Sequence, residues 1–502
     1  MIAKICSFSL DGLKGIPVSV EVDINNGLPA FEIVGLADTA VKESKERVRS
    51  AIKNSGRKMP SQRITANFAP ADVRKEGSVF DLALAIGVLK ASGQLVADVS
   101  DTVFLGELSL DGSLRRINGV LPILISAFNE GYGNFIIPAD NAAEASYVDG
   151  INVVAAKNLK EIIDHVSGLA ELKPIEKHKY SADGTERRYD SDLSLVKGQA
   201  VAKRALEVAV SGGHNLLFVG APGTGKTMLA KCIPTIMPDM SFSEALETTK
   251  IHSVAGLLKD RGIIYTRPFR SPHHTATTVA MTGGGTKLRP GEISLAHNGV
   301  LFLDEMPEYS RSTLEALRQP LEDGVITVSR AIGSVLYPAD FMLCGSMNPC
   351  PCGNYGSSDK ECTCTPSQIA KYKSRISGPL LDRIDIRVQV DGVKYGELSD
   401  DAAAETSETV RERVNKARRI QAERFSSDGI TTNAAMGEKH IKKYCRLSAE
   451  CQNLLENAYV SLKLSPRARS RIIKVSRTIA DMSDSKDIKP EHILEAISYR
   501  NY

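Results

Sequence analysis

Residues 216–227 read LLFVGAPGTGKT, an apolar run followed by a glycine-rich loop that ends in lysine and threonine. The last eight residues match the pattern G-x-x-x-x-G-K-[ST] in full, between a predicted strand and a predicted helix. The glycines allow backbone N–H groups to surround phosphate oxygens, and the helix adds its positive N-terminal end. The stretch therefore predicts a nucleotide-binding α/β domain.

Each residue of this loop has a predicted role. Lys226 is expected to reach the β- and γ-phosphates, and Thr227 is expected to bind Mg²⁺. The other residues expected to surround the phosphates are Gly220, Ala221, Pro222, Gly223, Thr224 and Gly225. The predicted cofactors are thus ATP and Mg²⁺.

Two later apolar strands end in polar residues that would complete such a site. VLFLDE at 300–305 ends in two carboxylates. Asp304 suits Mg²⁺ coordination, and Glu305 suits orientation or deprotonation of the attacking water. DFMLCGSMN ends in Asn348, which we expect to sense the γ-phosphate. Taken alone, an asparagine after a strand is usually a turn residue, so this role depends on the other two motifs.

Two arginines are candidates for contacts with the γ-phosphate. Arg383 lies in SGPLLDRIDI and is a candidate arginine finger that acts on a neighbouring subunit. Arg467 lies in LSPRARSR and is a candidate contact from a lid. If Arg383 acts in trans, the enzyme must be an oligomer. Most arginines are solvated surface charges, and this alternative remains open for both.

The composition sets limits on the other functions. The 502 residues carry a formal net charge of +3, too small for a global field that would imply nucleic acid. The N-terminal residues do not resemble a signal peptide, and the apolar run at 82–89 is far shorter than a membrane span of roughly 20 residues. We therefore expect a cytoplasmic protein without membrane association, with its nine cysteines reduced or bound to metal.

Changes of pattern along the chain predict four segments. Residues 1–170 alternate between strand and helix patterns, with one helix expected from an N-cap at Asp38 to Asn54. Residues 171–192 are charged and poor in large apolar residues, as in a linker. Residues 193–395 form the predicted ATPase domain, and residues 396–502 are almost entirely helical.

Four cysteines cluster in one loop of the predicted ATPase domain. The segment NPCPCGNYGSSDKECTCTP supplies Cys350, Cys352, Cys362 and Cys364 within an insertion at 350–364. Four thiols in a short loop suit a structural Zn²⁺ site. Both pairs are C-x-C and not the usual C-x-x-C, so reduced thiols and a redox switch remain alternatives. His273 and His274 have no flanking cysteines and are less suited as ligands.

Several long stretches closely resemble one family. RPFRSPHHTAT, GGGTKLRPGEISLAHNGVLFLDEMPEYSR and LEALRQPLEDGVITVSR occur in the order found in the magnesium-chelatase-like AAA+ proteins known as YifB or ComM. The resemblance covers essentially the whole chain. It implies an ATP-driven ring, expected to be a hexamer, whose subunits have a P-loop AAA+ α/β domain and a helical lid. In ComM-type members the implied activity is DNA helicase or branch migration during natural transformation, and in the chelatase relatives it is metal insertion into a porphyrin.

The N-terminal segment resembles a different enzyme. GELSLDGSLRRINGVL at 106–121 and EGSVFDLALAIGVLKASG are similar to parts of the Lon protease domain, which implies a ribosomal-S5-domain-2-like α+β fold. The resemblance places Val79 at the nucleophile of the Ser–Lys pair and Leu121 at the lysine. Ser78 is one position away. We therefore expect a proteolytically inactive module that binds DNA, a protein partner or neighbouring subunits.

Basic residues in two places are candidates for contact with a DNA backbone. VITVSRAIGSVLYP predicts a hairpin with Gly333 at the turn, and Arg330 or the nearby Arg267 and Arg270 could contact phosphates without reading sequence. An ordinary surface hairpin is the alternative. The leading hypothesis is a motor that acts on DNA, the second is an ATP-driven remodeller of a protein partner, and an active protease is the third.

Overall fold

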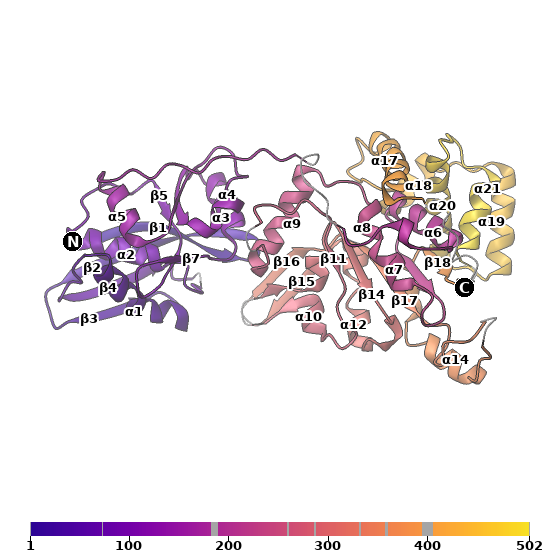
Figure 1. Ribbon diagram of the computed structural model, residues 1–502, viewed down its shortest axis with the longest axis horizontal. Coiled ribbons are helices and arrows are strands. Elements are labelled where there is room, and N and C mark those ends of the chain that lie inside the picture. Colours follow the sequence, from indigo (N-terminus) through magenta and orange to yellow (C-terminus); the bar gives the residue numbers. More distant parts are fainter. Residues whose placement is uncertain are drawn as a thin grey trace. The chain divides into compact units, whose positions relative to one another are not determined.

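The computed structural model describes residues 2–72, 74–181, 189–258, 261–285, 288–330, 333–356, 360–393 and 405–500. The chain divides into two compact units (Figure 1). The first unit holds residues 1–183 and 241–264, and the second holds residues 184–240 and 265–502. The chain therefore leaves the second unit once, contributes a segment to the first, and returns.

A seven-stranded mixed sheet forms the first unit, in the order β3-β4-β2-β1-β5-β8-β9. The β1–β2 and β2–β4 pairs are antiparallel, and the other four pairs are parallel. The strands of this unit are β1 (Ile2–Asp11), β2 (Lys14–Asn25), β3 (Ala30–Val34), β4 (Arg63–Ala69), β5 (Thr102–Phe104), β8 (Asn134–Pro138) and β9 (Asn152–Ala156), with β6 (Glu107–Leu108) and β7 (Leu114–Arg115) as a separate pair.

The helices of this unit form where the sequence supplies caps and apolar faces. They are α1 (Thr39–Asn54), α2 (Asp81–Ala91), α3 (Val120–Asn129), α4 (Ala142–Ala145) and α5 (Leu159–Val166). The Asp38 side chain accepts a hydrogen bond from the Val41 N–H, so the predicted N-cap of α1 is confirmed. Nearly every residue of α2 is buried, which explains its continuous apolar run.

Helix α9 (Phe242–Ala255) belongs to the first unit although its neighbours in sequence belong to the second. A capping box between Ser241 and Glu244 begins the helix. The Ser253 hydroxyl donates to the Glu144 carboxylate at 2.6 Å, and the Gly119 N–H donates to the Ser253 carbonyl at 3.1 Å. The ATPase domain predicted at 193–395 was continuous in sequence, so it did not anticipate that α9 packs with the first unit. Its boundaries stay predictions.

The second unit is built on a five-stranded parallel sheet in the order β11-β14-β17-β10-β18. Strand β17 lies between β10 and β14, so the carboxyl ends of these three strands meet at one edge. All residues of β10, β14 and β17 are buried, as expected for a sheet covered on both faces. The strands are β10 (Leu216–Val219), β11 (Phe269–Arg270), β14 (Val300–Leu303), β17 (Met342–Met347) and β18 (Ile386–Gln389).

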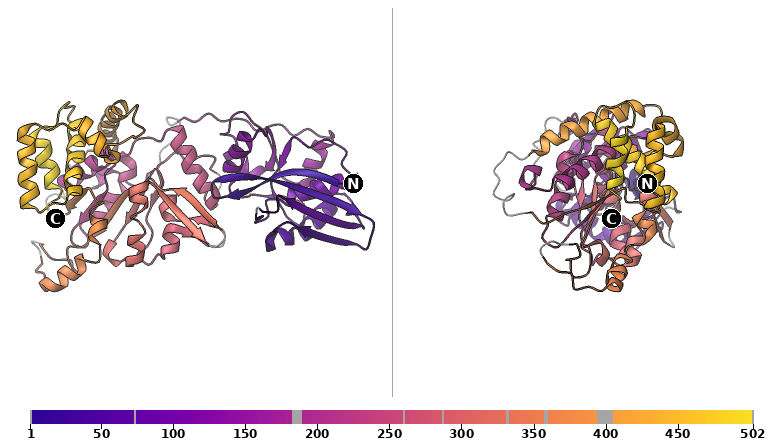
Figure 2. Two further views of the ribbon diagram at one scale, coloured as in Figure 1. Left: turned by 180° about the vertical axis from the view of Figure 1, so that it is seen from behind. Right: turned by 90° about the vertical axis from the view of Figure 1, so that its right-hand side faces the viewer.

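The helical C-terminal segment shares its hydrophobic core with this sheet. Helices α17 and α20 pack on α6 (Ala200–Gly212), and the helices after residue 405 lie together beside the sheet (Figure 2). This segment comprises α17 (Ser407–Arg424), α18 (Glu438–Tyr444), α19 (Ala449–Ser461), α20 (Pro466–Met482) and α21 (Pro490–Ser498). The predicted helical C-terminal domain is therefore confirmed.

Further helices and two strand pairs complete the second unit. The helices are α6 (Ala200–Gly212), α7 (Lys226–Lys231), α8 (Ile233–Ile236), α10 (Thr278–Thr282), α11 (Glu292–Leu295), α12 (Arg311–Glu315), α13 (Pro320–Asp323), α14 (Pro366–Lys373) and α15 (Gly378–Leu381). The strand pairs are β12 (Gly283–Gly284) with β13 (Arg289–Pro290), and β15 (Val325–Arg330) with β16 (Gly333–Pro338). The second pair is the predicted hairpin, in which Arg330 lies opposite Gly333.

Candidate nucleotide-binding site

The glycine-rich loop connects the end of β10 to the start of α7, as the sequence predicted. Gly223 and Gly225 have φ angles of 81° and 90°, which only glycine adopts without strain. Lys226 begins α7, and its ammonium donates to the carbonyl oxygens of Gly220 at 2.7 Å and Ala221 at 2.8 Å. Burial lowers the pKa of Lys226, and the carboxylates of Asp304 and Glu305 oppose this shift. The lysine therefore lies over the loop that would hold the phosphates.

The acidic residues after β14 contact the threonine of this loop. The Thr227 hydroxyl donates to Asp304 Oδ2 at 2.8 Å. These are two oxygen ligands of the kind that Mg²⁺ prefers, one from helix α7 and the other from the end of strand β14. Glu305 follows with a φ of 50°, a left-handed conformation that is rare outside glycine. Such strained backbone is concentrated at functional sites, which fits the role predicted for Glu305.

Asn348 and Ser346 extend this site from the central strand β17. The Lys226 ammonium donates to Asn348 Oδ1 at 3.3 Å, so the asparagine lies at the phosphate loop as predicted. The Ser346 hydroxyl donates to Asp304 Oδ1 and accepts from the Glu305 N–H at 3.2 Å. Sequence reasoning missed Ser346. The available signal was its spacing of two from Asn348, which places both side chains on the same face of a strand.

His274 is a second residue near the site that sequence reasoning did not assign. Its Nδ1 lies 3.5 Å from Glu305 Oε2, and its ring is 4.1 Å from that of His273. Only the tertiary structure shows this proximity, because the histidine lies about thirty residues before the glutamate in the chain. The imidazole is placed to orient the carboxylate that we assign to water activation.

The two candidate arginines lie together, on the carboxylate of Glu322. Arg383 is buried, donates to the Pro379 carbonyl at 2.9 Å, and forms an ion pair with Glu322 Oε2. Arg467 lies with Nη2 3.8 Å from Glu322 Oε1, and its side chain is largely exposed. From the sequence, Arg383 was predicted to be a finger acting in trans and Arg467 a contact from a lid. In the structure, both lie next to Glu322, an acidic residue on α13.

The four predicted cysteine ligands also lie together. Their sulfur atoms are all within 4.8 Å of one another. Cys350 Sγ is 3.4 Å from Cys352 Sγ and 3.6 Å from Cys362 Sγ. A tetrahedral zinc site with Zn–S bonds of about 2.3 Å separates its sulfurs by about 3.8 Å. Backbone N–H groups of Asn354 and Thr363 lower the pKa of Cys352 to about 5. The donor set therefore fits Zn²⁺.

This cysteine loop packs directly on the phosphate loop. Cys350 follows Asn348 by two residues, and Gly353 approaches Pro222 so closely that a Cβ at Gly353 would lie 2.5 Å from Pro222 Cδ. Gly353 also has a φ of 82°. The position therefore requires glycine both for its backbone conformation and for this contact. A metal bound by the cysteines would support the loop that holds the phosphates.

The basic residues proposed for DNA contact have different surroundings. Arg267 donates to the carbonyls of Pro238 at 2.7 Å and Asn298 at 2.8 Å. Arg270 forms a two-point ion pair with Glu292 at 2.6 and 2.7 Å. These two guanidinium groups thus bind within the unit, whereas the side chain of Arg330 lies outside the described residues.

In the first unit, the positions assigned to a protease pair are occupied by apolar side chains. Val79 and Leu121 pack in the same hydrophobic cluster, and Leu121 is 1% exposed. The nearby Ser78 hydroxyl donates to the Glu107 carboxylate. Two neighbouring arginines of the segment at 106–121 differ in their surroundings. Arg116 Nη2 lies 3.7 Å from the buried Glu144 carboxylate, whereas 67% of the Arg115 side-chain surface is exposed. The apolar packing at both positions supports the prediction of an inactive protease module.

Comparison with known proteins identifies the family. Profiles of magnesium chelatase, subunit ChlI, match residues 192–398 and, for its C-terminal part, residues 404–500, and a further profile of subunit ChlI of Mg-chelatase matches residues 20–141. Competence protein ComM of Haemophilus influenzae is 44% identical over 492 residues, which is 97% of this chain and 95% of the relative. The chain belongs to the magnesium-chelatase ChlI-like family. The uncharacterized protein YifB of Escherichia coli is also 44% identical, over 491 residues covering 97% of this chain and 95% of the relative.

Membership of the ChlI-like family confirms the predicted fold. It implies an AAA+ ATPase, with the parallel sheet and helical C-terminal domain described above. Lon protease 2 of Bacillus subtilis is 31% identical over 126 residues, covering 25% of this chain and 22% of the relative. This match confirms the Lon-like character of the N-terminal unit. None of the described helices of this ChlI-like chain is both long and apolar enough to cross a membrane.

Proposed function

We propose that this chain is the subunit of an ATP-hydrolysing ring motor that acts on DNA as a helicase or branch-migration enzyme. The observation that best supports ATP hydrolysis is the 2.8 Å hydrogen bond between Thr227 of the phosphate loop and Asp304 of the acidic pair after β14. Similarity to a competence protein over nearly the full length supports the DNA part. DNA is the proposed substrate because the resemblance to ComM-type proteins implies an activity on DNA.

The proposed reaction assigns one role to each residue at the carboxyl edge of the sheet. Lys226 neutralises charge on the β- and γ-phosphates, and Thr227 with Asp304 holds Mg²⁺, which supplies further charge neutralisation. Glu305 orients the attacking water and accepts its proton. Asn348, hydrogen-bonded to Lys226, reports loss of the γ-phosphate to strand β17.

The proposed assembly is a homo-oligomeric ring, most simply a hexamer. Arg383 would act as an arginine finger on the nucleotide of the neighbouring subunit, where such a residue contributes roughly 10³–10⁵ in rate. Arg467 would act beside it, since both arginines reach the carboxylate of Glu322. Hydrolysis would then depend on assembly.

The proposed contact with DNA is to the backbone and independent of sequence. Hairpin β15–β16 and the helical C-terminal domain carry basic residues that can neutralise phosphates. Such binding releases counterions, so DNA stimulation should fall steeply as salt rises.

A second candidate is an ATP-driven remodeller of a protein partner. The matches to magnesium chelatase subunit ChlI along the chain favour it, because that family is described as one subunit of a larger enzyme. In either case the N-terminal unit would bind a partner, DNA or neighbouring subunits and would not cut peptides.

Four cysteines are proposed to hold a structural zinc ion: Cys350, Cys352, Cys362 and Cys364. We expect about one zinc per chain by metal analysis, lost when Cys362 is replaced by serine. Purified protein with full nucleotide affinity and no bound zinc would favour the alternative of reduced thiols or a redox switch.

The deciding experiment is the steady-state ATPase rate without DNA and with single-stranded, duplex and four-way-junction DNA, at low and moderate salt. Glu305→Gln serves as the hydrolysis-deficient control. Strong, salt-sensitive stimulation supports the DNA motor, and the preferred DNA indicates its task. A healthy basal rate that no DNA stimulates favours the protein remodeller.

A further inference from the structure

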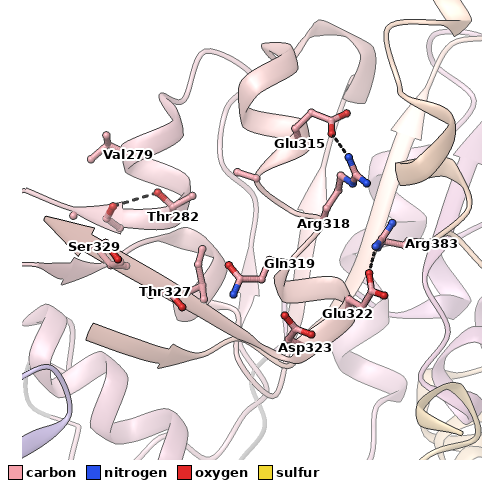
Figure 3. A pocket seen from close by; sticks show the side chains of 15 residues that line it. Val279, Thr282, Glu315, Arg318, Gln319, Glu322, Asp323, Thr327, Ser329 and Arg383 are labelled. Atoms are coloured by element: carbon pink, nitrogen blue, oxygen red, sulfur yellow. Dashed lines mark hydrogen bonds and ion pairs between the residues drawn. The ribbon is translucent and has the colours of Figure 1, made fainter. Parts of the chain in front are cut away.

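Glu322 lies where three parts of the second unit meet. It is on α13, and β15 of the hairpin begins three residues later. The Ala339 N–H donates to the Gly324 carbonyl at 2.8 Å, which closes the base of the hairpin beside this helix. Glu322 thus lies beside the hairpin base and contacts Arg383, the arginine after α15 (Figure 3). It also lies near Arg467 of α20.

The guanidinium of Arg383 depends on Glu322 for its charge partner. Only 8% of the Arg383 side-chain surface is exposed, so its charge is largely removed from water. One nitrogen donates to the Pro379 carbonyl at 2.9 Å, and another donates to Glu322. A buried charge without a partner is strongly unfavourable, so the carboxylate fixes which way the guanidinium is directed. The same contact is the main reason why the pKa of Glu322 is lowered.

Arg467 is held far more weakly by the same carboxylate. Its Nη2 is 3.8 Å from Glu322 Oε1, and 62% of its side-chain surface is exposed. Exposed ion pairs of this kind contribute little. The carboxylate of Glu322 therefore forms an ion pair with the buried Arg383 and only a weak, exposed ion pair with Arg467.

Glu322 and Arg383 line a cavity of about 820 Å³ that is also lined by a second glutamate–arginine pair, which serves for comparison. Glu315 and Arg318 lie on its wall, with Arg318 Nη1 2.9 Å from Glu315 Oε2 (Figure 3). This pair has the same chemistry as Glu322 and Arg383, and it lines the same cavity. Its arginine is 44% exposed, so that guanidinium keeps water as an alternative partner.

We propose that Glu322 is a positioning residue for Arg383, holding its guanidinium in the orientation that acts on a nucleotide bound by the neighbouring subunit. The proposal rests on the proposed ATPase function and on the trans role of Arg383. Because an arginine finger supplies roughly 10³–10⁵ in rate, even partial loss of its orientation is measurable. Glu322 also connects Arg383 to the base of hairpin β15–β16, because α13 ends two residues before β15 begins.

The first test compares Glu322→Gln with Glu315→Gln, using full-length assembled protein. We expect Glu322→Gln to lower kcat at least about tenfold with KM changed less than about twofold, because nucleotide binding by the same subunit is untouched. Glu315→Gln should stay within about twofold of the unmodified protein in both parameters. Equal nucleotide affinity and equal unfolding temperature of the two variants show that both are folded.

The second test asks whether Glu322 acts through Arg383. In Arg383→Ala protein, the additional change Glu322→Gln should lower kcat by no more than about twofold, since the residue it positions is already absent. A full further tenfold loss would overturn the proposal. So would a rate for Glu322→Gln equal to or above that of the unmodified protein.

Mixed rings supply a readout that a merely structural role would not change. Glu322→Gln subunits keep their nucleotide site, and Lys226→Ala subunits keep Arg383 and Glu322. Mixing the two should give more hydrolysis than the sum of the separate rates, because an intact finger then faces an intact site. A mixture with no more than the summed rates overturns the proposal.

The same series separates failure of this proposal from failure of the proposed function. If Glu305→Gln does not abolish hydrolysis, the assigned ATPase site is wrong. If it does, but Arg383→Ala hydrolyses ATP at the unmodified rate, the ATPase stands while the finger and its positioning by Glu322 are overturned. If both controls lower the rate and Glu322→Gln does not, only the positioning role is overturned.

Discussion

In the second unit the ends of β10, β14 and β17 bring together Lys226, Asp304 and Asn348, whereas the first unit fills its protease-like positions with Val79 and Leu121. The polar residues of the second unit are hydrogen-bonded to residues of the same site at one edge of the sheet, where we propose that they bind ATP and Mg²⁺. The corresponding apolar residues of the first unit pack into a core. Under the proposed function, the polar positions of the second unit contribute chemistry, whereas the apolar positions of the first unit contribute packing.

The largest expected effect tests the active half of this comparison. Lys226→Ala and Glu305→Gln should each lower ATP hydrolysis by about 10³ or more, since each removes a group assigned to the reacting phosphate or water. Fluorescent-nucleotide titration should separate them, with binding lost in Lys226→Ala and retained in Glu305→Gln. If both variants hydrolyse ATP normally, the second unit has no ATPase site at this edge.

The second largest expected effect concerns the hydrophobic core of the first unit. Leu121→Ala should destabilise the first unit by about 2–5 kcal/mol, because it removes a buried leucine side chain and leaves a cavity. Chemical denaturation would measure this loss, and the ATPase rate of the folded protein should stay within about twofold. An unchanged stability would contradict the assignment of Leu121 to the core.

A smaller effect is expected where the cysteine loop contacts the phosphate loop. Gly353→Ala should weaken ATP binding about tenfold, because the added methyl group would collide with Pro222. Gly356→Ala is the matched control: its φ of 78° is similar, but no atom lies within 4 Å of the added Cβ. Isothermal titration calorimetry measures both. Equal affinities in the two variants would show that the contact with Pro222 does not support nucleotide binding.

The smallest expected effect concerns Ser346, the hydroxyl that sequence reasoning missed. Ser346→Ala removes a hydrogen bond to Asp304, so the Mg²⁺ concentration for half-maximal ATPase activity should rise about threefold to tenfold. Ser334→Ala, which alters an exposed hydroxyl of the hairpin, is the control and should leave this concentration unchanged. A kcat loss without any change in Mg²⁺ dependence would place Ser346 outside the metal site.

Local patterns predicted much of the nucleotide site. The glycine spacing before Lys226 and the carboxylates after an apolar strand are features of consecutive residues, so they can be read without the fold. The N-cap at Asp38 was predicted for the same reason. Ser346 was missed because its one local signal, the spacing of two from Asn348, is weak within a buried strand. His274 was missed because its partner Glu305 is distant in sequence.

The phosphate-loop residues and the cluster of four cysteines could be predicted from the sequence because each depends on spacing within one short segment. The ATPase fold was predicted from the order of several motifs along the chain. The fold was needed to show that Glu322 contacts Arg383 and Arg467, that Gly353 approaches Pro222, and that α9 packs with the first unit. These contacts connect residues far apart in the chain. They follow from how buried charges and close-packed surfaces are satisfied once the elements assemble.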